Sequence, residues 1–312
     1  MPDLRINRTN DYLFKRVFSS EDVLLGFLNA VFKPPVGREL VKVDLLDREI
    51  DPRHLLDRGA RLDILARTED GTLINIEVQV ANEYNIDQRS LYYWAGLYHG
   101  QLTVGRKFAD LCKTVTINIL QFNWFKDDKK RYHRTFHVRE DNTGELLLED
   151  LEMHFLELPK AKDLARAPED PLDSWMAYLN NLEGEAMEVI AMNNPPIRKA
   201  MTLEQAFMQN KQERRIYELR EKARLDEISA LEGAEARGEA RGEARGQAQG
   251  QAQAFQEAIC EYLDARFGSD SQGLQDHVRQ ITRPDLLNKI IKRIFTVNSF
   301  QEAEAVVDQT MK

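Results

Sequence analysis

The feature that most constrains the fold of this chain is the stretch RLDILARTEDGTLINIEVQV, Arg61 to Val80, in which two short runs flank a turn signal. From Ile74 to Val80 the second run alternates strictly between apolar residues at even positions and polar residues at odd positions. A period of two places successive side chains on opposite faces of a strand. The stretch therefore predicts a β-hairpin with one apolar face and one polar face.

The length of the turn decides how the two strands of this hairpin pair. A two-residue turn at Asp70 and Gly71 would put apolar residues of the first strand beside polar residues of the second. A three-residue loop that begins at Glu69, with Gly71 in the left-handed conformation of a bulge, instead pairs Ile64 with Ile76. Because this pairing keeps the apolar side chains on one face, we predict the three-residue loop.

The predicted register sets two carboxylates against each other. It places Asp63 directly opposite Glu77, and Arg61 opposite Gln79, on the polar face. Directly opposed Cβ atoms lie roughly 4.5–5.5 Å apart, and opposed like charges destabilise a sheet. A divalent cation such as Mg²⁺, which is usually held by one or two carboxylates, would neutralise the pair. An ordinary solvated hairpin face, with Arg61 offsetting the acids, is the alternative interpretation.

Composition excludes several classes of protein. With 42% hydrophobic and 30% charged residues over 312 positions, the chain is typical of a globular protein. No apolar run is long enough to span a bilayer or to form the core of a signal peptide, so we expect a cytoplasmic protein without a membrane partner. Cys112 and Cys260 lie far apart, and the six histidines show no metal-ligand spacing. Neither a disulfide framework nor a cysteine or histidine metal site is expected.

The charge is unevenly distributed along the chain. The formal net charge is -9, to which residues 1–140 contribute +2 and residues 141–312 contribute -11. An acidic surface repels nucleic acid, so any nucleic-acid site is expected in the first half of the chain. Within that half, KDDKKRYHR (Lys126 to Arg134) is a basic cluster that would follow a DNA backbone or form a solvated hairpin tip.

Helical and strand patterns alternate in the first half of the chain. Asn10 predicts a helix N-cap, Ser19 or Ser20 predicts a break, and the turn residues of KPPVG end the second helix. Strand patterns then occupy LVKVDLLDREI, the hairpin, KTVTINILQFNWF, YHRTFHVRE and EMHFLELP, and a helix passes through DQRSLYYWAGLYHGQL. This order predicts an α/β fold, with a mixed sheet and flanking helices.

After about residue 160 the strand patterns stop, and an all-helical C-terminal region is expected. We predict an α/β domain over residues 1–160, a helical extension over 161–233, a repeat over 234–254 and a small helical module over 255–312. The repeat, AEARGEARGEARGQAQGQAQ, has a period of four, which aligns like charges and places four glycines inside a helix. It is predicted to be either a marginal helical spacer or a self-association element that makes a homodimer through the helical C-terminal half.

Several ordered blocks of the first half resemble one family. They are NDYLFKRVFSS, LLGFLNAVF, LDILART with GTLINIEVQV, RSLYYWAGLYHGQLTVG, VTINIL and HFLELPK, which together cover roughly residues 7 to 160. In these blocks the chain resembles the Rpn family of recombination-promoting nucleases and transposases, within the PD-(D/E)XK nuclease superfamily. The resemblance implies a restriction-endonuclease-like core that cuts DNA with a divalent metal, Mg²⁺ or else Mn²⁺ or Ca²⁺.

The resemblance also implies roles for particular residues. Asp63 and Glu77 become catalytic, metal-binding acids, and the backbone carbonyl of Val78 adds a ligand. Gln79 stands where the usual motif of the superfamily has lysine, so it is expected to orient the attacking water without supplying positive charge. This departure makes a catalytically weak or inactive DNA-binding or regulatory protein the alternative to a nuclease.

A second group of residues is predicted to contact DNA or support the site. Asp11 and Lys15 lie early on the first helix, Arg61 lies in the hairpin, and Arg89 and Tyr93 lie on the helix that follows the hairpin. Lys15 or Arg89 would neutralise a phosphate, and the tyrosine would contact sugar or base. Ordinary packing is the alternative for Tyr93. The sequence therefore predicts a metal-dependent DNA endonuclease acting in recombination or on mobile or invading DNA.

Overall fold

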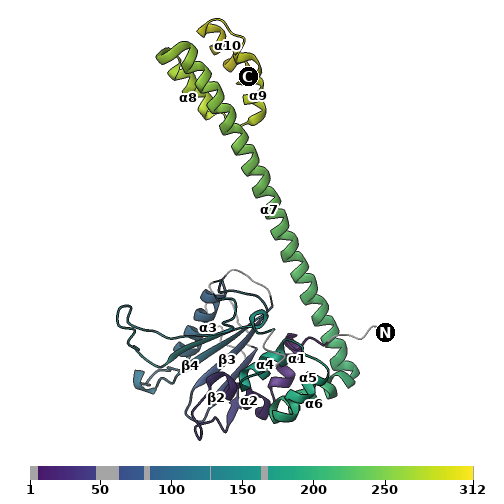
Figure 1. The fold of residues 1–312 in the computed structure, drawn as a ribbon. Helices are drawn as coiled ribbons and strands as arrows, with labels where there is room; N and C mark the ends of the chain where they lie inside the picture. The colour runs from purple at the N-terminus through teal and green to yellow at the C-terminus, as the bar shows by residue number, and fades with distance from the viewer. Residues whose placement is uncertain (1–5, 47–62, 81–84, 127, 163–167, 312) are drawn as a thin grey trace. The chain divides into compact units, whose positions relative to one another are not determined.

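The computed structural model describes residues 6–46, 63–80, 85–126, 128–162 and 168–311. The internal contacts divide the chain into two compact units, Met1–Asp226 and Glu227–Lys312. The first unit is built on a six-stranded sheet in the order β1-β2-β3-β4-β6-β5 (Figure 1). Its strands are β1 (Val43–Leu45), β2 (Ile64–Thr68), β3 (Leu73–Gln79), β4 (Thr114–Leu120), β5 (His133–Phe136) and β6 (Leu151–Glu157).

The sheet is mixed, as the sequence predicts. Strands β3, β4 and β6 run parallel, while β1, β2 and β5 add antiparallel pairs at the two sides. Helix α3 (Ile86–Gly100) makes the crossover from β3 toward β4. The expected fold class, a mixed sheet with flanking helices followed by a helical C-terminal region, is confirmed.

Two helices at the start of the chain follow the predicted capping signals. In α1 (Asp11–Phe18) the side chain of Asn10 accepts hydrogen bonds from the backbone N–H groups of Tyr12 and Leu13. A break at the two serines separates it from α2 (Glu21–Phe32). Both helices bury their apolar faces against one face of the sheet. The Asn10 cap therefore fixes the residue at which the first helix begins.

The hairpin between β2 and β3 has the predicted register. Ile64 pairs with Ile76 and Ala66 with Ile74, and all four side chains are fully buried. Gly71 has a φ of +86°, the left-handed conformation expected for the third loop residue. Its N–H donates to the carbonyl of Thr68. Arg61, which the same register would place opposite Gln79, lies outside the described residues.

The helices after β6 belong to the first unit. They are α4 (Pro171–Leu179), α5 (Glu185–Asn193) and α6 (Pro195–Gln209). Trp175, Tyr178 and Phe207 from these helices are buried in the same core as the strands. The contact boundary at Asp226 therefore differs from the boundary expected near residue 160. The physical reason is that α1 and α2 alone leave part of their apolar surface to be covered, and α4 and α6 cover it.

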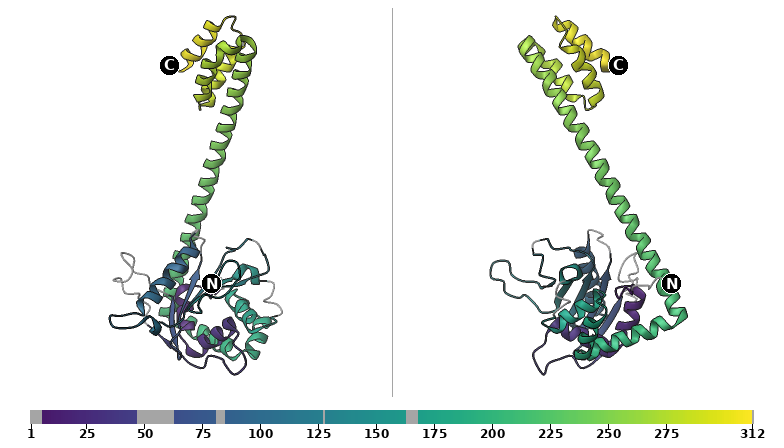
Figure 2. Two further views of the ribbon diagram at one scale, coloured as in Figure 1. Left: turned by 90° about the vertical axis from the view of Figure 1, so that its left-hand side faces the viewer. Right: turned by 45° about the vertical axis from the view of Figure 1, so that its right-hand side comes forward.

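Helix α7 (Lys211–Phe267) runs through the whole four-residue repeat. Over residues 234–251 every side chain is exposed in the single chain. In the second unit, the end of α7 packs with α8 (Gln272–Gln280), α9 (Pro284–Ile294) and α10 (Phe300–Met311), as Figure 2 shows. Ile259, Leu263 and Ile290 are at the centre of this small core. No helix within the described residues is both long enough and apolar enough to span a bilayer.

Candidate active site

Two carboxylates meet where the hairpin strands end. Asp63 directly precedes β2, and continuing the register by one residue sets it opposite Glu77 of β3. The N–H of Asp63 donates to the Glu77 carboxylate at 3.3 Å, and the N–H of Val78 donates to the Asp63 carboxylate at 3.0 Å. Asp63 is 9% exposed and Glu77 is 5% exposed. The hairpin register thus places two acidic side chains side by side in a largely buried position.

A lysine from a distant part of the sequence contacts this pair. The Lys15 Nζ atom lies 2.7 Å from the Asp63 carboxylate, and the two side chains are 19% and 13% exposed. Lys15 is carried by α1, whose position the Asn10 cap fixes. Because Asp63 already receives the Val78 N–H, its charge is well compensated.

The negative charge of the Glu77 carboxylate is compensated less well than that of Asp63. Burial, followed by the neighbouring charge of Asp63, raises the pKa of Glu77 to about 8, although Arg89 on α3 acts in the opposite direction. Removing a carboxylate from water disfavours its ionised form, and a nearby like charge adds to the effect. In the metal-free protein Glu77 is therefore protonated near neutral pH.

This protonation predicts a pH dependence of stability. Between about pH 4.5 and pH 8 the folded protein keeps a proton on Glu77 that the unfolded chain has lost, so stability falls as pH rises. We expect Glu77→Gln to remove this component of the slope. Urea denaturation of the metal-free wild type and variant at a series of pH values measures it. Equal slopes for the two proteins would contradict the raised pKa.

A buried polar layer extends the site along the face of the sheet that α3 covers. The Asn118 amide donates to the Ser90 hydroxyl at 2.8 Å, and Ser90 also contacts the Thr116 hydroxyl at 3.3 Å. Asn75, two residues before Glu77, is fully buried, and its side chain lies close enough to the Glu77 carboxylate to oppose the rise of that group's pKa. None of these residues was predicted as part of the site, although the alternation of polar residues in TVTINIL indicated Thr116 and Asn118.

The donor set fits a hard divalent cation. Both carboxylates offer oxygen ligands, which Mg²⁺ prefers. In an extended strand the N–H and C=O of one residue point to the same side, so the Val78 carbonyl faces the side of Asp63, as its N–H does. Among the described residues, no group of three or more histidine, cysteine or acidic side chains converges on one point. A cation at Asp63 and Glu77 would therefore depend on two carboxylates and other oxygens.

The remaining predicted residues have different partners in the structure. The Arg89 side chain donates to the Tyr93 hydroxyl at 3.1 Å, and its charge reaches Glu77. Asp11 instead forms an exposed ion pair with Arg220 at 3.4 Å. Gln79 is largely buried, and its carbonyl accepts the N–H of Gln121 at 3.0 Å.

Comparison with protein families gives a match over most of the chain. The family model described as PD-(D/E)XK nuclease family transposase matches residues 8–234, which is more than half of the chain and includes the sheet, α1 to α6 and both carboxylates. Among curated proteins and among solved structures, nothing matches the chain significantly. The match agrees with the family resemblance of the sequence blocks and extends it beyond residue 160.

Proposed function

We propose that this chain, which belongs to the PD-(D/E)XK nuclease family of transposases, is a divalent-metal-dependent DNA endonuclease with Asp63 and Glu77 as its metal-binding acids. The observation that supports this most directly is the pair of adjacent, largely buried carboxylates, one of which has a raised pKa. A pair of this kind costs free energy in the metal-free protein. A bound cation would recover that cost, which favours a binding role over a structural one.

In the proposed mechanism the protein positions the groups that react. Asp63, Glu77 and the Val78 carbonyl would hold Mg²⁺, or Mn²⁺ or Ca²⁺ in its place. When bound, the ion supplies Lewis-acid polarisation of the phosphate and a water of lowered pKa. Gln79 would orient that water through its carboxamide, which donates and accepts hydrogen bonds but carries no charge.

Lys15 would provide the positive charge that Gln79 lacks. Its ammonium group is held 2.7 Å from Asp63 by a helix that is packed on the sheet, so it stays beside the site without a large conformational cost. A fixed cation next to a phosphate stabilises the negative charge that develops in the transition state. The same cation competes with a metal ion for Asp63.

These two effects predict that Lys15→Met lowers the rate of DNA cleavage and raises the affinity for a metal ion. Cleavage should fall by about a hundredfold, because one preorganised positive group is lost. The affinity for Mn²⁺, measured by titration calorimetry, should rise because Asp63 is released. Lys211→Met, at an exposed lysine on α7, is the matched control. Unchanged cleavage together with unchanged affinity would exclude the role given to Lys15.

The direct test of the proposed function uses supercoiled plasmid DNA. We expect nicking or linearisation with Mg²⁺ or Mn²⁺ and none with EDTA. Binding without cleavage under every metal condition would favour the alternative, a nuclease-fold DNA-binding or regulatory protein. A role in recombination or on mobile or invading DNA, within the cytoplasm, is the biological proposal that the transposase family supports.

The helical C-terminal half is proposed to form a homodimer. Over residues 234–251 α7 is exposed along its whole circumference, and this stretch contains four glycines that each cost about 1 kcal/mol relative to alanine. Close approach of a second copy along the glycines would offset that cost. We expect the full chain to sediment as a dimer, and Gly242→Glu with Gly246→Glu to make it monomeric. A wild type that is monomeric at every concentration would leave the repeat as a spacer.

A further inference from the structure

A pocket of about 570 Å³ lies beyond the carboxyl ends of two parallel strands in the first unit. Gln121 directly follows β4, and Leu158 directly follows β6. The neighbouring parallel strand β3 carries Glu77 and Gln79 near the same edge of the sheet, and the Gln121 N–H donates to the Gln79 carbonyl at 3.0 Å. Ligands of open α/β sheets bind outside the carboxyl ends of the strands. The pocket therefore lies at the edge where a substrate of the carboxylate pair would pass.

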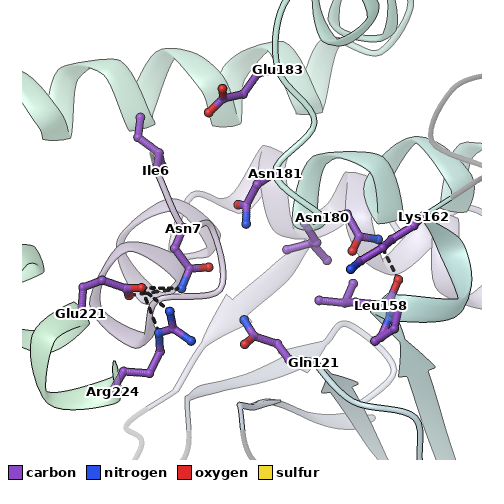
Figure 3. A pocket seen from close by; sticks show the side chains of 12 residues that line it. Ile6, Asn7, Gln121, Leu158, Lys162, Asn180, Asn181, Glu183, Glu221 and Arg224 are labelled. Carbon is purple, nitrogen blue, oxygen red and sulfur yellow. Dashed lines mark hydrogen bonds and ion pairs between the residues drawn. The ribbon is translucent and has the colours of Figure 1, made fainter. Parts of the chain in front are cut away.

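Four carboxamides line the pocket: Asn7, Gln121, Asn180 and Asn181 (Figure 3). Two of them are oriented by hydrogen bonds to the backbone. The Asn180 amide nitrogen donates to the Leu158 carbonyl at 2.9 Å, and the Asn181 amide oxygen accepts the Arg8 N–H at 2.8 Å. Gln121 donates to the Thr9 hydroxyl. Each of these three carboxamides therefore has one polar atom committed to the fold.

The other polar atom of each group is available to a ligand. Within the described residues, the Asn180 oxygen, the Asn181 nitrogen and the Gln121 oxygen have no hydrogen-bond partner. Figure 3 shows Gln121 and Asn181 pointing into the pocket from different walls. Fixed carboxamides that present both donors and acceptors match the edge of a nucleobase.

The charges and the apolar wall of the pocket narrow the choice of ligand. Lys162 and Arg224 are balanced by Glu183 and Glu221, and Arg224 pairs directly with Glu221. A pocket without net charge does not select a free polyphosphate. Leu158 and Leu179 supply apolar surface against which a flat ring can pack. The chemistry suits the uncharged base of a nucleotide better than its phosphate.

We propose that this pocket receives one unstacked nucleobase of the DNA strand whose phosphodiester is held at Asp63 and Glu77. The inference rests on the proposed function and adds a base-reading subsite to it. Unstacking a base costs free energy, and the cost is least in single strands and at mismatches. The hydrogen bonds to Gln121, Asn180 and Asn181 offset that cost. The enzyme would then prefer substrates in which a base leaves the stack easily.

The test places the fluorescent base 2-aminopurine at successive positions of an oligonucleotide bound to the full chain in Ca²⁺. Emission increases when this base leaves its stack. We expect an increase at one position with the wild type. Gln121→Leu should remove it and weaken binding by about tenfold, as measured by fluorescence anisotropy. Glu183→Trp, a change at an exposed residue that fills the pocket, should do the same. Glu188→Trp, exposed on α5 and outside the pocket, should not.

The outcomes separate this inference from the proposed function. If the wild type cleaves DNA but no position increases in emission, or if Glu183→Trp keeps the wild-type increase, the base subsite is overturned and the nuclease stands. If the wild type neither binds nor cleaves DNA, both are overturned. The subsite is supported if the wild type shows an increase in 2-aminopurine emission that Gln121→Leu and Glu183→Trp remove and Glu188→Trp keeps.

Discussion

Glu77→Gln and Asp63→Asn are expected to abolish metal-dependent DNA cleavage, with a loss of at least about a hundredfold in rate. Each variant removes one of the two anionic ligands while it keeps the size of the side chain. Glu77→Gln should also make the metal-free protein more stable above about pH 8, because the buried carboxylate that is ionised there in the wild type is no longer present. Plasmid cleavage and thermal unfolding at pH 9 in EDTA measure the two effects.

A neighbouring acid provides the control for these variants. Glu69 lies in the turn of the same hairpin and is exposed, so Glu69→Gln should leave both cleavage and stability close to those of the wild type. Equal cleavage by wild type, Glu77→Gln and Asp63→Asn would indicate a contaminating nuclease and remove the support for the site. Loss of cleavage accompanied by lower stability of Glu77→Gln at pH 9 would instead show that Glu77 is a structural residue.

Glu204→Ala is expected to destabilise the first unit by about 3–5 kcal/mol, because it leaves the buried charge of Arg8 without its partner. The Arg8 Nε atom lies 2.7 Å from the Glu204 carboxylate, and the two side chains are only 5% and 6% exposed. The guanidinium also donates to the carbonyls of Tyr178 and Leu182, at 3.1 and 2.8 Å. One ion pair thus connects the start of the chain to α4 and α6.

Tryptophan fluorescence during urea denaturation measures this loss, since all three tryptophans of the chain lie in the first unit. Glu188→Ala, at an exposed acid on α5, is the control and should stay within about 0.5 kcal/mol of the wild type. A similarly small effect of Glu204→Ala would mean that α4 to α6 contribute little to the fold of the sheet domain. In that case α4 to α6 would lie against the sheet domain, within the unit that ends at Asp226, without stabilising it.

Local patterns in the sequence were sufficient for much of the first unit. The period of two between Ile74 and Val80, together with the glycine of the turn, predicted the hairpin register, and the structure has that register. The Asn10 cap and the break at Ser19 and Ser20 were also predicted from neighbouring residues. These features depend on interactions within a few residues, which a single sequence displays directly.

Three features were decided by the tertiary structure. They are the approach of Lys15 to Asp63, the ion pair of Arg8 with Glu204, and the pocket beside Gln121 and Asn181. Each joins residues that are far apart in the chain, and no spacing rule marks them. The extent of the first unit beyond residue 160 has the same origin, since a helical pattern reveals an apolar face but not the surface that covers it. By itself the sequence determined that two acids face each other in a hairpin. Only packing determined which cation reaches them, because that depends on how separate elements meet in space.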